Sequence, residues 1–373
     1  MKWSGSLPDV VVIGGGAMGL TAAWELRQRG LAVTLVERAQ PGRAASWASA
    51  GIVSSPSGPR SSPNSRLQAL SYGLWPAFAE HVRAASGMDP EFRLMGCLIP
   101  AWTTSGANGL RTVVWHGAEQ EGKLLEGQEL RDAEPGLAPD ILAALWKPGG
   151  NVDNRRLCRA LELCARQSGV EFRCGEEVRA VTIQGGRIAG VELRGGSVAA
   201  ETVIVAAGAW SGELSSVRPP TPVVPQRGQI LALDRGDVRL HHVILNPDDP
   251  YLVPRADGRV VVGATREMAG WDPTMTAGGV AWLLNEAMRT IPALSTCPIY
   301  EQWTGFRPLS PDGIPIIGKG GADGLYMLTG HGPSGIGPLP GSVAVLLASI
   351  FGETPPIPPD PYSPLRWLSL IHI

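Results

Sequence analysis

The chain has 373 residues, of which 44% are hydrophobic and 18% charged, a composition that is ordinary for a soluble enzyme of two domains. Its formal net charge of −2 disfavours nucleic-acid binding through a basic surface, and no apolar run reaches the roughly 18 residues of a membrane span. The five cysteines are scattered without a C-x-x-C pair, and the segment from Met1 to Pro8 is short and polar, so we expect a cytoplasmic protein with neither a metal site nor a secretory signal.

The first predicted elements form a strand–helix–strand unit. An apolar run at 9–13 predicts a buried strand, apolar positions at helical spacing predict a helix over 17–29, and a second apolar run predicts a strand at 32–36. Between the first strand and the helix, three glycines form the pattern G-x-G-x-x-G, namely Gly14, Gly16 and Gly19.

This glycine pattern predicts a dinucleotide-binding loop. The first glycine permits a tight turn, the second lets the backbone approach a pyrophosphate, and the third lets helix and strand pack closely. The helix N-terminus then offers free N–H groups to the phosphates. Glu37 follows Gly14 by 23 residues, at the end of the second strand, where a carboxylate accepts hydrogen bonds from a ribose diol. Glycines alone would also suit a plain strand–helix turn, and Glu37 favours the dinucleotide.

The rest of the chain continues with further strands and helices. Residues 42–65 are rich in Ser, Ala, Gly and Pro and predict a long loop, whereas residues 89–149 predict a separate insertion. Asp153 is a good N-cap for a helix, and two later Gly-Gly turns predict a meander of short strands. The other predicted elements are helices over 67–82, 280–291 and 341–351 and strands at 170–172, 202–206, 229–233, 251–253 and 259–265.

Six segments follow one another in a characteristic order: Gly42–Gly51, Val203–Ser211, Tyr251–Arg255, Val260–Thr265, Gly305–Gly318 and Thr329–Ile336. With them the chain resembles the D-amino acid oxidase and glycine oxidase family, in its bacterial glycine oxidase branch, from Val10 to about Arg366. The resemblance implies an α/β fold with an FAD-binding Rossmann-like domain of the D-amino acid oxidase type and a second, mainly antiparallel β substrate domain. The expected FAD-binding domain comprises residues 1–85, 150–218 and 305–367. The expected substrate-binding domain comprises residues 86–149 and 219–304.

The resemblance also implies that FAD is bound without a covalent link. Covalent members of the sarcosine-oxidising group use a cysteine near Gly305–Gly318, and this chain has none there. Ser334, Gly335 and Ile336 would face the flavin pyrimidine, where a glycine-rich turn at a helix N-terminus favours negative charge on the reduced ring. The cofactor-binding residues implied are Gly14, Gly16, Gly19, Glu37, Arg38, Ser46, Ala50, Gly51, Val178, Ala207, Gly208, Ser334, Gly335 and Ile336.

Three further residues are implied to bind substrate. Arg307 would bind the amino-acid carboxylate, since a guanidinium fork matches a carboxylate bidentately; the alternative is a pair with a structural carboxylate. Tyr251 would give the same carboxylate a phenolic hydrogen bond, unless it is an ordinary strand tyrosine. Arg266 occupies a position that contacts substrate in the branch and is often apolar there. It is therefore either a second arginine of the pocket or part of a surface pair with Glu267.

The implied chemistry asks for no catalytic acid or base and for no metal. Family members transfer a hydride from the substrate Cα to flavin N5, release an imine that hydrolyses to an oxo acid and ammonia, and reoxidise the flavin with O2 to give hydrogen peroxide. His331 is interpreted as a positioning or satisfied residue. Trp47, Trp271 and Trp303 are candidates for the pocket wall, and Pro333 replaces an arginine that is usual in the branch.

We therefore expect an FAD-dependent enzyme that oxidatively deaminates glycine or a small D-amino acid. The alternatives are an N-methyl amino acid oxidase of the sarcosine type and a quinone-coupled D-amino acid dehydrogenase. A tRNA-modifying oxidoreductase fits the net charge less well, and a flavin-binding protein without turnover follows if Pro333 spoils the site. The expected partners are the amino-acid substrate and O2, with no nucleic acid and no membrane; a homo-oligomer is left open.

Overall fold

A computed structural model of the chain describes residues 8–56, 61–115, 122–214, 216–246 and 250–367, so most of the polar segment Met1 to Pro8 lies outside the described residues. The first sheet has six strands in the order β19 (Ile316–Lys319), β20 (Leu325–Thr329), β13 (Thr202–Val205), β1 (Val10–Ile13), β2 (Val33–Glu37) and β9 (Glu171–Cys174). Its neighbouring strands are parallel except for β19 and β20. The register aligns Ile13 with both Val36 and Val205, so three strand ends meet at one edge.

Alternate residues of β1 face two different layers, because successive side chains of a strand point to opposite faces. Val11 and Ile13 pack against a three-stranded meander of β10 (Val178–Gln184), β11 (Arg187–Leu193) and β12 (Gly196–Ala199). Burial on both faces explains the uninterrupted apolar run of β1. Val10 and Val12 join a core on the other face that is completed by the helices α1 (Ala17–Gln28), α3 (Pro63–Ser86), α6 (Asn154–Gln167) and α8 (Leu339–Phe351).

The beginnings of these helices differ in how their backbone N–H groups are satisfied. The Asp153 carboxylate accepts hydrogen bonds from the backbone N–H groups of Arg155 and Arg156, both at 2.9 Å, which confirms the predicted N-cap of α6. Ser62 caps α3 through a bond from the N–H group of Ser65. The N-cap of α1 is Gly16, which has no side chain, so the first turn of α1 takes its acceptors from outside the helix.

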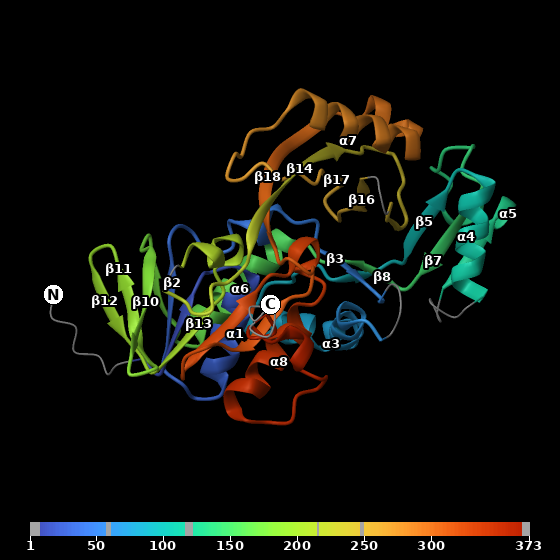
Figure 1. The fold of residues 1–373 in the computed structure, drawn as a ribbon. Helices are drawn as coiled ribbons and strands as arrows, with labels where there is room; N and C mark the ends of the chain where they lie inside the picture. Colours follow the sequence, from blue (N-terminus) through green and yellow to red (C-terminus); the bar gives the residue numbers. More distant parts are fainter. Residues whose placement is uncertain (1–7, 57–60, 116–121, 215, 247–249, 368–373) are drawn as a thin grey trace.

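The second sheet has eight strands and is mainly antiparallel, as predicted. Only β15 and β5 pair in parallel, and α7 (Ala277–Thr290) packs Leu283 and Ala287 into the core of this sheet. Figure 1 shows the long strands β14 and β18 rising from the region of the first sheet to the second. The strand order is β18 (Ile299–Leu309), β14 (Val224–Asp234), β17 (Arg259–Gly263), β16 (Tyr251–Pro254), β15 (Val243–Ile244), β5 (Cys97–Ala101), β7 (Ala143–Lys147) and β6 (Lys123–Glu126).

Shorter elements complete the fold and include one correction. The predicted loop over 42–65 is wrong in part, because it contains α2 (Ala45–Ala48) and β3 (Ile52–Ser54). Strand β3 pairs with β8 (Gly149–Asn151), which also pairs with β4 (Arg93–Leu94), and such distant pairing leaves no local signal in the sequence. The remaining helices are α4 (Thr104–Trp115), α5 (Gly127–Ala133), η1 (Gly208–Glu213), η2 (Pro292–Thr296), η3 (Gly332–Ser334) and η4 (Asp360–Tyr362).

Two sequence-based expectations relate to the chain as a whole. The segment boundaries of the two domains remain a prediction, and β18 runs across the expected boundary between residues 304 and 305. Among the described residues, the longest helices are either too short or too polar to pass through a lipid bilayer.

Candidate cofactor and substrate site

A cavity of about 1370 Å³ lies between the nucleotide-binding edge of the first sheet and the second sheet. Its volume exceeds the about 300–1,000 Å³ of ordinary small-molecule pockets, which leaves room for an extended dinucleotide beside a small substrate. Of the residues predicted to bind cofactor or substrate, Gly19 alone does not line it. The predicted residues that line the cavity are Gly14, Gly16, Glu37, Arg38, Ser46, Ala50, Gly51, Val178, Ala207, Gly208, Tyr251, Arg266, Arg307, Ser334, Gly335 and Ile336.

The glycine loop has no space for side chains. A Cβ on Gly14, whose φ is +104°, would lie 2.5 Å from the carbonyl oxygen of Ala206. A Cβ on Gly16 would lie 3.3 Å from the Ser46 hydroxyl, and one on Gly19 would lie 1.9 Å from the carbonyl oxygen of Gly14. The first two glycines thus form a bare backbone surface on the cavity. The third allows α1 to pack against the loop, which explains why Gly19 does not line the cavity.

Glu37 is fixed at the end of β2 by the same loop. One carboxylate oxygen accepts the N–H group of Gly15 at 2.7 Å and the other accepts that of Ala39 at 2.9 Å. Each carboxylate oxygen has a second lone pair for a further donor. Because Glu37 also lines the cavity, its geometry fits the predicted ribose contact. The bare glycine surface, the helix N-terminus and this acceptor together fit the diphosphate and ribose of FAD.

A buried arginine that was not predicted as a site residue anchors the cavity-lining segment around Ala50. Arg255 is 6% exposed and donates to the carbonyl oxygens of Ala50 at 2.9 Å and Val152 at 2.7 Å. It also donates to the side-chain oxygens of Asn151 and Asn154. Burial lowers the pKa of Arg255 below that of an ordinary guanidinium, although the group stays charged. The segment around Ala50 is therefore tied to β16 of the second sheet.

Arg307 and Tyr251 lie together at the end of the cavity formed by the second sheet. Arg307 Nη1 donates to the carbonyl oxygen of Thr265 at 2.8 Å and to that of Arg227 at 3.4 Å. The Arg307 charge acts on the hydroxyl of Tyr251, which lines the same cavity. Burial raises the pKa of Tyr251, and the cations Arg307 and Arg255 oppose this rise. Burial lowers the pKa of Arg307, and the charge of Arg266 acts in the same direction. The arrangement concentrates positive charge and hydrogen-bond donors at one point of the cavity wall.

Arg266 is exposed and lines the same cavity, next to Thr265. The neighbouring Glu267 carboxylate accepts hydrogen bonds from Arg227, Gln229 and Thr265. A surface pair between Arg266 and Glu267, the alternative drawn from the sequence, would have to compete with these three donors.

Aromatic side chains close one side of the cavity. Trp210 and Trp271 stack with ring centroids 4.6 Å apart, Phe306 packs edge-on against both, and the Arg38 guanidinium lies 3.6 Å from the Trp210 ring centre. All four residues line the cavity.

The interpretation of Trp271 as a wall residue thus agrees with the structure. Trp47 and Trp303 instead pack against each other and are not among the lining residues, so the same interpretation is wrong for them.

Trp210 and Phe306 were missed as wall residues, although both lie in the family segments of the sequence. Trp210 is in Val203–Ser211, and Phe306 immediately precedes Arg307 on β18. Neighbouring side chains of a strand alternate between its two faces, yet Phe306 and Arg307 both line the cavity, so the strand pattern gives no signal for Phe306.

His331 is a buried, neutral residue that lines the cavity. Its Nε2 atom lies 3.0 Å from the Ser342 hydroxyl, and burial lowers its pKa to about 3. Neutral imidazole at pH 7 agrees with the interpretation of His331 as a satisfied residue. Pro333, Ser334, Gly335 and Ile336 follow it along the cavity.

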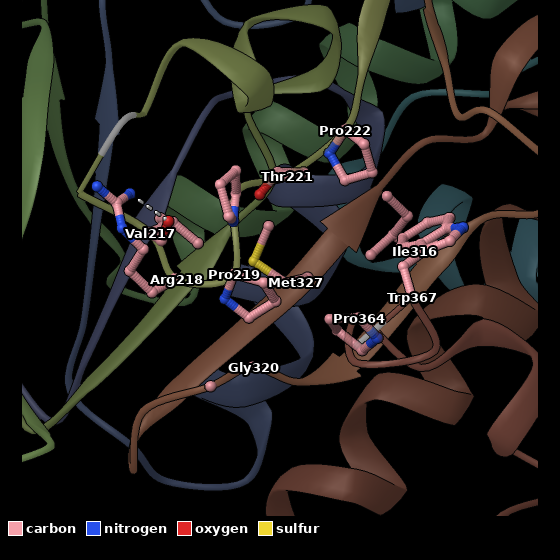
Figure 2. Close-up of a pocket in the computed structure, with 12 residues that line it drawn as sticks. Val217, Arg218, Pro219, Thr221, Pro222, Ile316, Gly320, Met327, Pro364 and Trp367 are labelled. Atoms are coloured by element: carbon pink, nitrogen blue, oxygen red, sulfur yellow. Dashed lines mark hydrogen bonds between the residues drawn. The ribbon is translucent and has the colours of Figure 1, made fainter. Parts of the chain in front are cut away.

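A second, much smaller cavity lies apart from these residues. It measures about 10 Å³ and is bordered by Pro219, Pro222, Met327 and Trp367 (Figure 2). This space suits about one water molecule and no substrate. The large cavity is therefore the candidate site.

Comparison with known families and proteins gives a consistent result. The family model described as DAO, FAD dependent oxidoreductase, matches residues 9–350, a range that contains every residue lining the large cavity. The chain is similar to the glycine oxidase of Pseudomonas aeruginosa, with 36% identity over 95% of this chain and 98% of that protein. It is also similar to the bifunctional protein ThiO/ThiG of Synechocystis sp., with 34% identity over 97% of this chain. The chain spans only 54% of that bifunctional relative.

Solved structures show the same likeness. The glycine oxidase from Geobacillus kaustophilus matches with a TM-score of 0.89 and 28% identity, over 96% of this chain and 98% of that one. Iminodiacetate oxidase (IdaA) from Chelativorans sp. BNC1 matches with a TM-score of 0.82 and 28% identity, over 95% of this chain and 98% of that one.

Proposed function

This chain belongs to the DAO family of FAD dependent oxidoreductases, and from that premise we propose that it oxidatively deaminates a small amino acid such as glycine or a D-amino acid, with O2 as the electron acceptor. The relatives named glycine oxidase, at 31–36% identity, support an amino acid as substrate. The single observation that carries the proposal is the pairing of Arg307 with Tyr251 in the cavity that the glycine loop also lines.

The chain's own residues would bind and orient the substrate. The free donors of the Arg307 guanidinium and the Tyr251 hydroxyl bind the α-carboxylate. This contact fixes how far the substrate Cα lies from the end of the cavity formed by the second sheet. The aromatic side chains of Trp210, Trp271 and Phe306 form an apolar wall along one side of the cavity. Bound FAD supplies the two-electron acceptor that amino-acid side chains lack. Because His331 is neutral and satisfied, we assign no catalytic acid or base.

The cofactor is proposed to be held without a covalent bond. Of the described residues that line the cavity, none is a cysteine. All five cysteines are free thiols, and three of them are buried. Unpaired thiols suit a reducing compartment, which supports a cytoplasmic location. A homo-oligomer remains a prediction without support from the contacts described here.

One experiment tests the proposal against its alternatives. The purified holoenzyme is mixed anaerobically with glycine, D-alanine, sarcosine and D-aspartate in turn, and bleaching of flavin absorbance is followed. Reduction by glycine or a D-amino acid is expected, with hydrogen peroxide formed once air is admitted. Faster reduction by sarcosine identifies the N-methyl amino acid oxidase. Reduction without peroxide identifies the quinone-coupled dehydrogenase, and no reduction by any of them overturns the proposal.

Arg266 favours a second candidate, an amino acid that carries two carboxylates. It lines the same end of the cavity, and its charge acts on both Tyr251 and Arg307. Two guanidinium groups at one end of a small site suit D-aspartate, D-glutamate or an N-carboxymethyl compound. The similar structure named iminodiacetate oxidase supports this class. The preference requires a dry pocket, because an exposed ion pair adds about 0–1 kcal/mol.

A further inference from the structure

Behind Arg307 lies a polar network that no part of the proposed reaction uses. Arg227 and Gln229 are on β14 and are 5% and 0% exposed. Arg227 donates to the Glu267 carboxylate and, through Nη1, to Asp272 Oδ2 at 2.8 Å. Gln229 donates to the other oxygen of Glu267 at 2.7 Å. The Glu267 carboxylate is thus held by a buried cation and a buried amide.

This network reaches Arg307 through Thr265. The Thr265 hydroxyl donates to Glu267 and accepts the backbone N–H group of Gln229 at 2.8 Å. The carbonyl oxygen of the same residue accepts Arg307 Nη1 at 2.8 Å. Glu267 and the substrate arginine are therefore attached to opposite sides of a single residue.

The backbone leaves Arg307 little freedom to change partners. A Cβ on Gly228, between Arg227 and Gln229 on β14, would lie 2.5 Å from Arg307 Nη2. The guanidinium hence rests directly on the β14 backbone, and the same strand supplies the cation that binds Glu267. The Glu267 charge acts on Arg307, so a Glu267 carboxylate released from Arg227 would be an internal anion able to compete with a substrate carboxylate for Arg307.

We infer that Arg227 is a positioning residue for substrate binding: by holding the Glu267 carboxylate, it keeps this anion away from Arg307 and leaves the guanidinium to the substrate carboxylate. This inference rests on the proposed function, in which Arg307 binds that carboxylate. Arg227 itself contacts no substrate. The second carboxylate bound to Arg227, that of Asp272, is half exposed, so it contributes little to this role.

The test measures the dissociation constant of acetate, a carboxylate that cannot be oxidised, from the change it causes in the flavin absorbance of the holoenzyme. Arg227→Met removes the cation that holds the Glu267 carboxylate and leaves only the neutral donors Gln229 and Thr265. It is therefore expected to weaken acetate binding at least about tenfold, equivalent to about 1.4 kcal/mol. Arg227→Met combined with Glu267→Gln removes the competing charge, and acetate affinity is expected to return to within about threefold of Glu267→Gln alone. Asp272→Asn is the matched control and should leave acetate affinity within about twofold of the wild type.

The outcomes separate this inference from the proposed function. If Arg227 has only a structural role, the double variant should bind acetate no more tightly than Arg227→Met, and that result overturns the inference. Normal acetate binding in Arg227→Met overturns it as well. If Arg227→Met does not fold, Arg227→Lys decides: it keeps a cation beside Glu267, and an acetate affinity reduced tenfold or more in a folded Arg227→Lys holoenzyme contradicts the inference. Normal acetate binding in Arg307→Ala instead overturns the carboxylate site of the proposed function.

Discussion

At the scale of single residues, the site holds two arginines with the same charge but different exposure. Arg307 is fixed by the Thr265 carbonyl oxygen and lies beside Tyr251, whereas Arg266 is exposed on the same cavity wall. A guanidinium has five N–H donors in a fixed plane, and the two backbone acceptors, both bonded to Nη1, leave most of them for a ligand. The anchored arginine is therefore suited to a fixed carboxylate, and the exposed one to selecting among side chains.

Arg307→Ala is expected to leave folding and FAD content intact but to weaken amino-acid binding. Loss of a charge-assisted bidentate contact typically costs about 2–5 kcal/mol, which corresponds to about 30- to 5000-fold in kcat/KM. Arg307→Lys should also be impaired, because an ammonium group cannot reproduce the planar fork. Steady-state kinetics of peroxide formation measures both variants. Arg83→Ala, at an exposed helix position, is the matched control, and a near-normal kcat/KM in Arg307→Ala would show that another residue holds the carboxylate.

Arg266→Met tests the dicarboxylate class. If Arg266 binds a second carboxylate, the ratio of kcat/KM for D-aspartate to that for D-alanine should fall at least about tenfold in the variant, equivalent to about 1.4 kcal/mol. The activity with D-alanine serves as the internal control, because its methyl side chain has no charge. An unchanged ratio would mean that the exposed guanidinium is solvated and that a small neutral amino acid is the better substrate.

At the scale of elements, the contact between α1 and its preceding loop depends on Gly19. Gly19→Ala places a Cβ 1.9 Å from the Gly14 carbonyl oxygen, so helix and loop must move apart. Overpacking of this kind typically costs about 1–3 kcal/mol, and here it also displaces the backbone that faces the FAD diphosphate. We expect a lower melting temperature and reduced FAD content, measured by thermal unfolding and by flavin absorbance.

Gly73→Ala provides the control for that substitution. A Cβ on Gly73, within α3, has open space within 4 Å, and Ala is favoured over Gly in a helix by about 0.5–1 kcal/mol. The control should retain FAD and be at least as stable as the wild type. Equal FAD content in Gly19→Ala and Gly73→Ala would contradict the close-packing role of Gly19.

The cap of α6 gives a second prediction at this scale. Asp153→Ala removes the acceptor of two backbone N–H groups and should lower the free energy of unfolding by about 0.5–2 kcal/mol. Asp153→Asn keeps an acceptor at the cap and should recover most of that loss. Denaturant unfolding measures both. Equal destabilisation by the two substitutions would indicate that the charge near Arg259, rather than the cap, is what α6 needs.

The elements that could be predicted from the sequence are those with local signals. The glycine loop, the Asp153 cap and the strand of Tyr251 can each be recognised from a pattern of a few residues. In the structure the glycine loop and Tyr251 line one cavity, and Asp153 caps α6, as expected. The Arg227–Glu267 contact joins β14 to an isolated bridge residue 40 positions later, and the Trp210–Trp271 stack joins a 3₁₀ helix to a loop of the other sheet. Such contacts depend on strand register, which composition and periodicity do not specify.

At the scale of the whole molecule, the cavity lies where the two sheets meet, so bound FAD would hold both together. A ligand that binds only the folded chain stabilises it by about 2.7 kcal/mol at a concentration of 100 times its Kd. We therefore expect a higher melting temperature with FAD than after its removal. We also expect heat or acid to release the yellow cofactor into the supernatant. Flavin that stays with the denatured polypeptide would contradict non-covalent binding.

The order of strands in the first sheet has a consequence for how the protein is made. The central strand β13 pairs with β1 on one side, as Val203 with Val11, and with β20 on the other, as Val203 with Leu325. When a ribosome has delivered the glycine loop, most of the sheet that must support it has not yet been translated. Pairings between such distant segments form slowly, because a long stretch of chain must be closed before any contact forms. The nascent chain thus contains the glycine loop long before the rest of the nucleotide site has been synthesised. We therefore expect FAD to bind at the end of synthesis or after release from the ribosome.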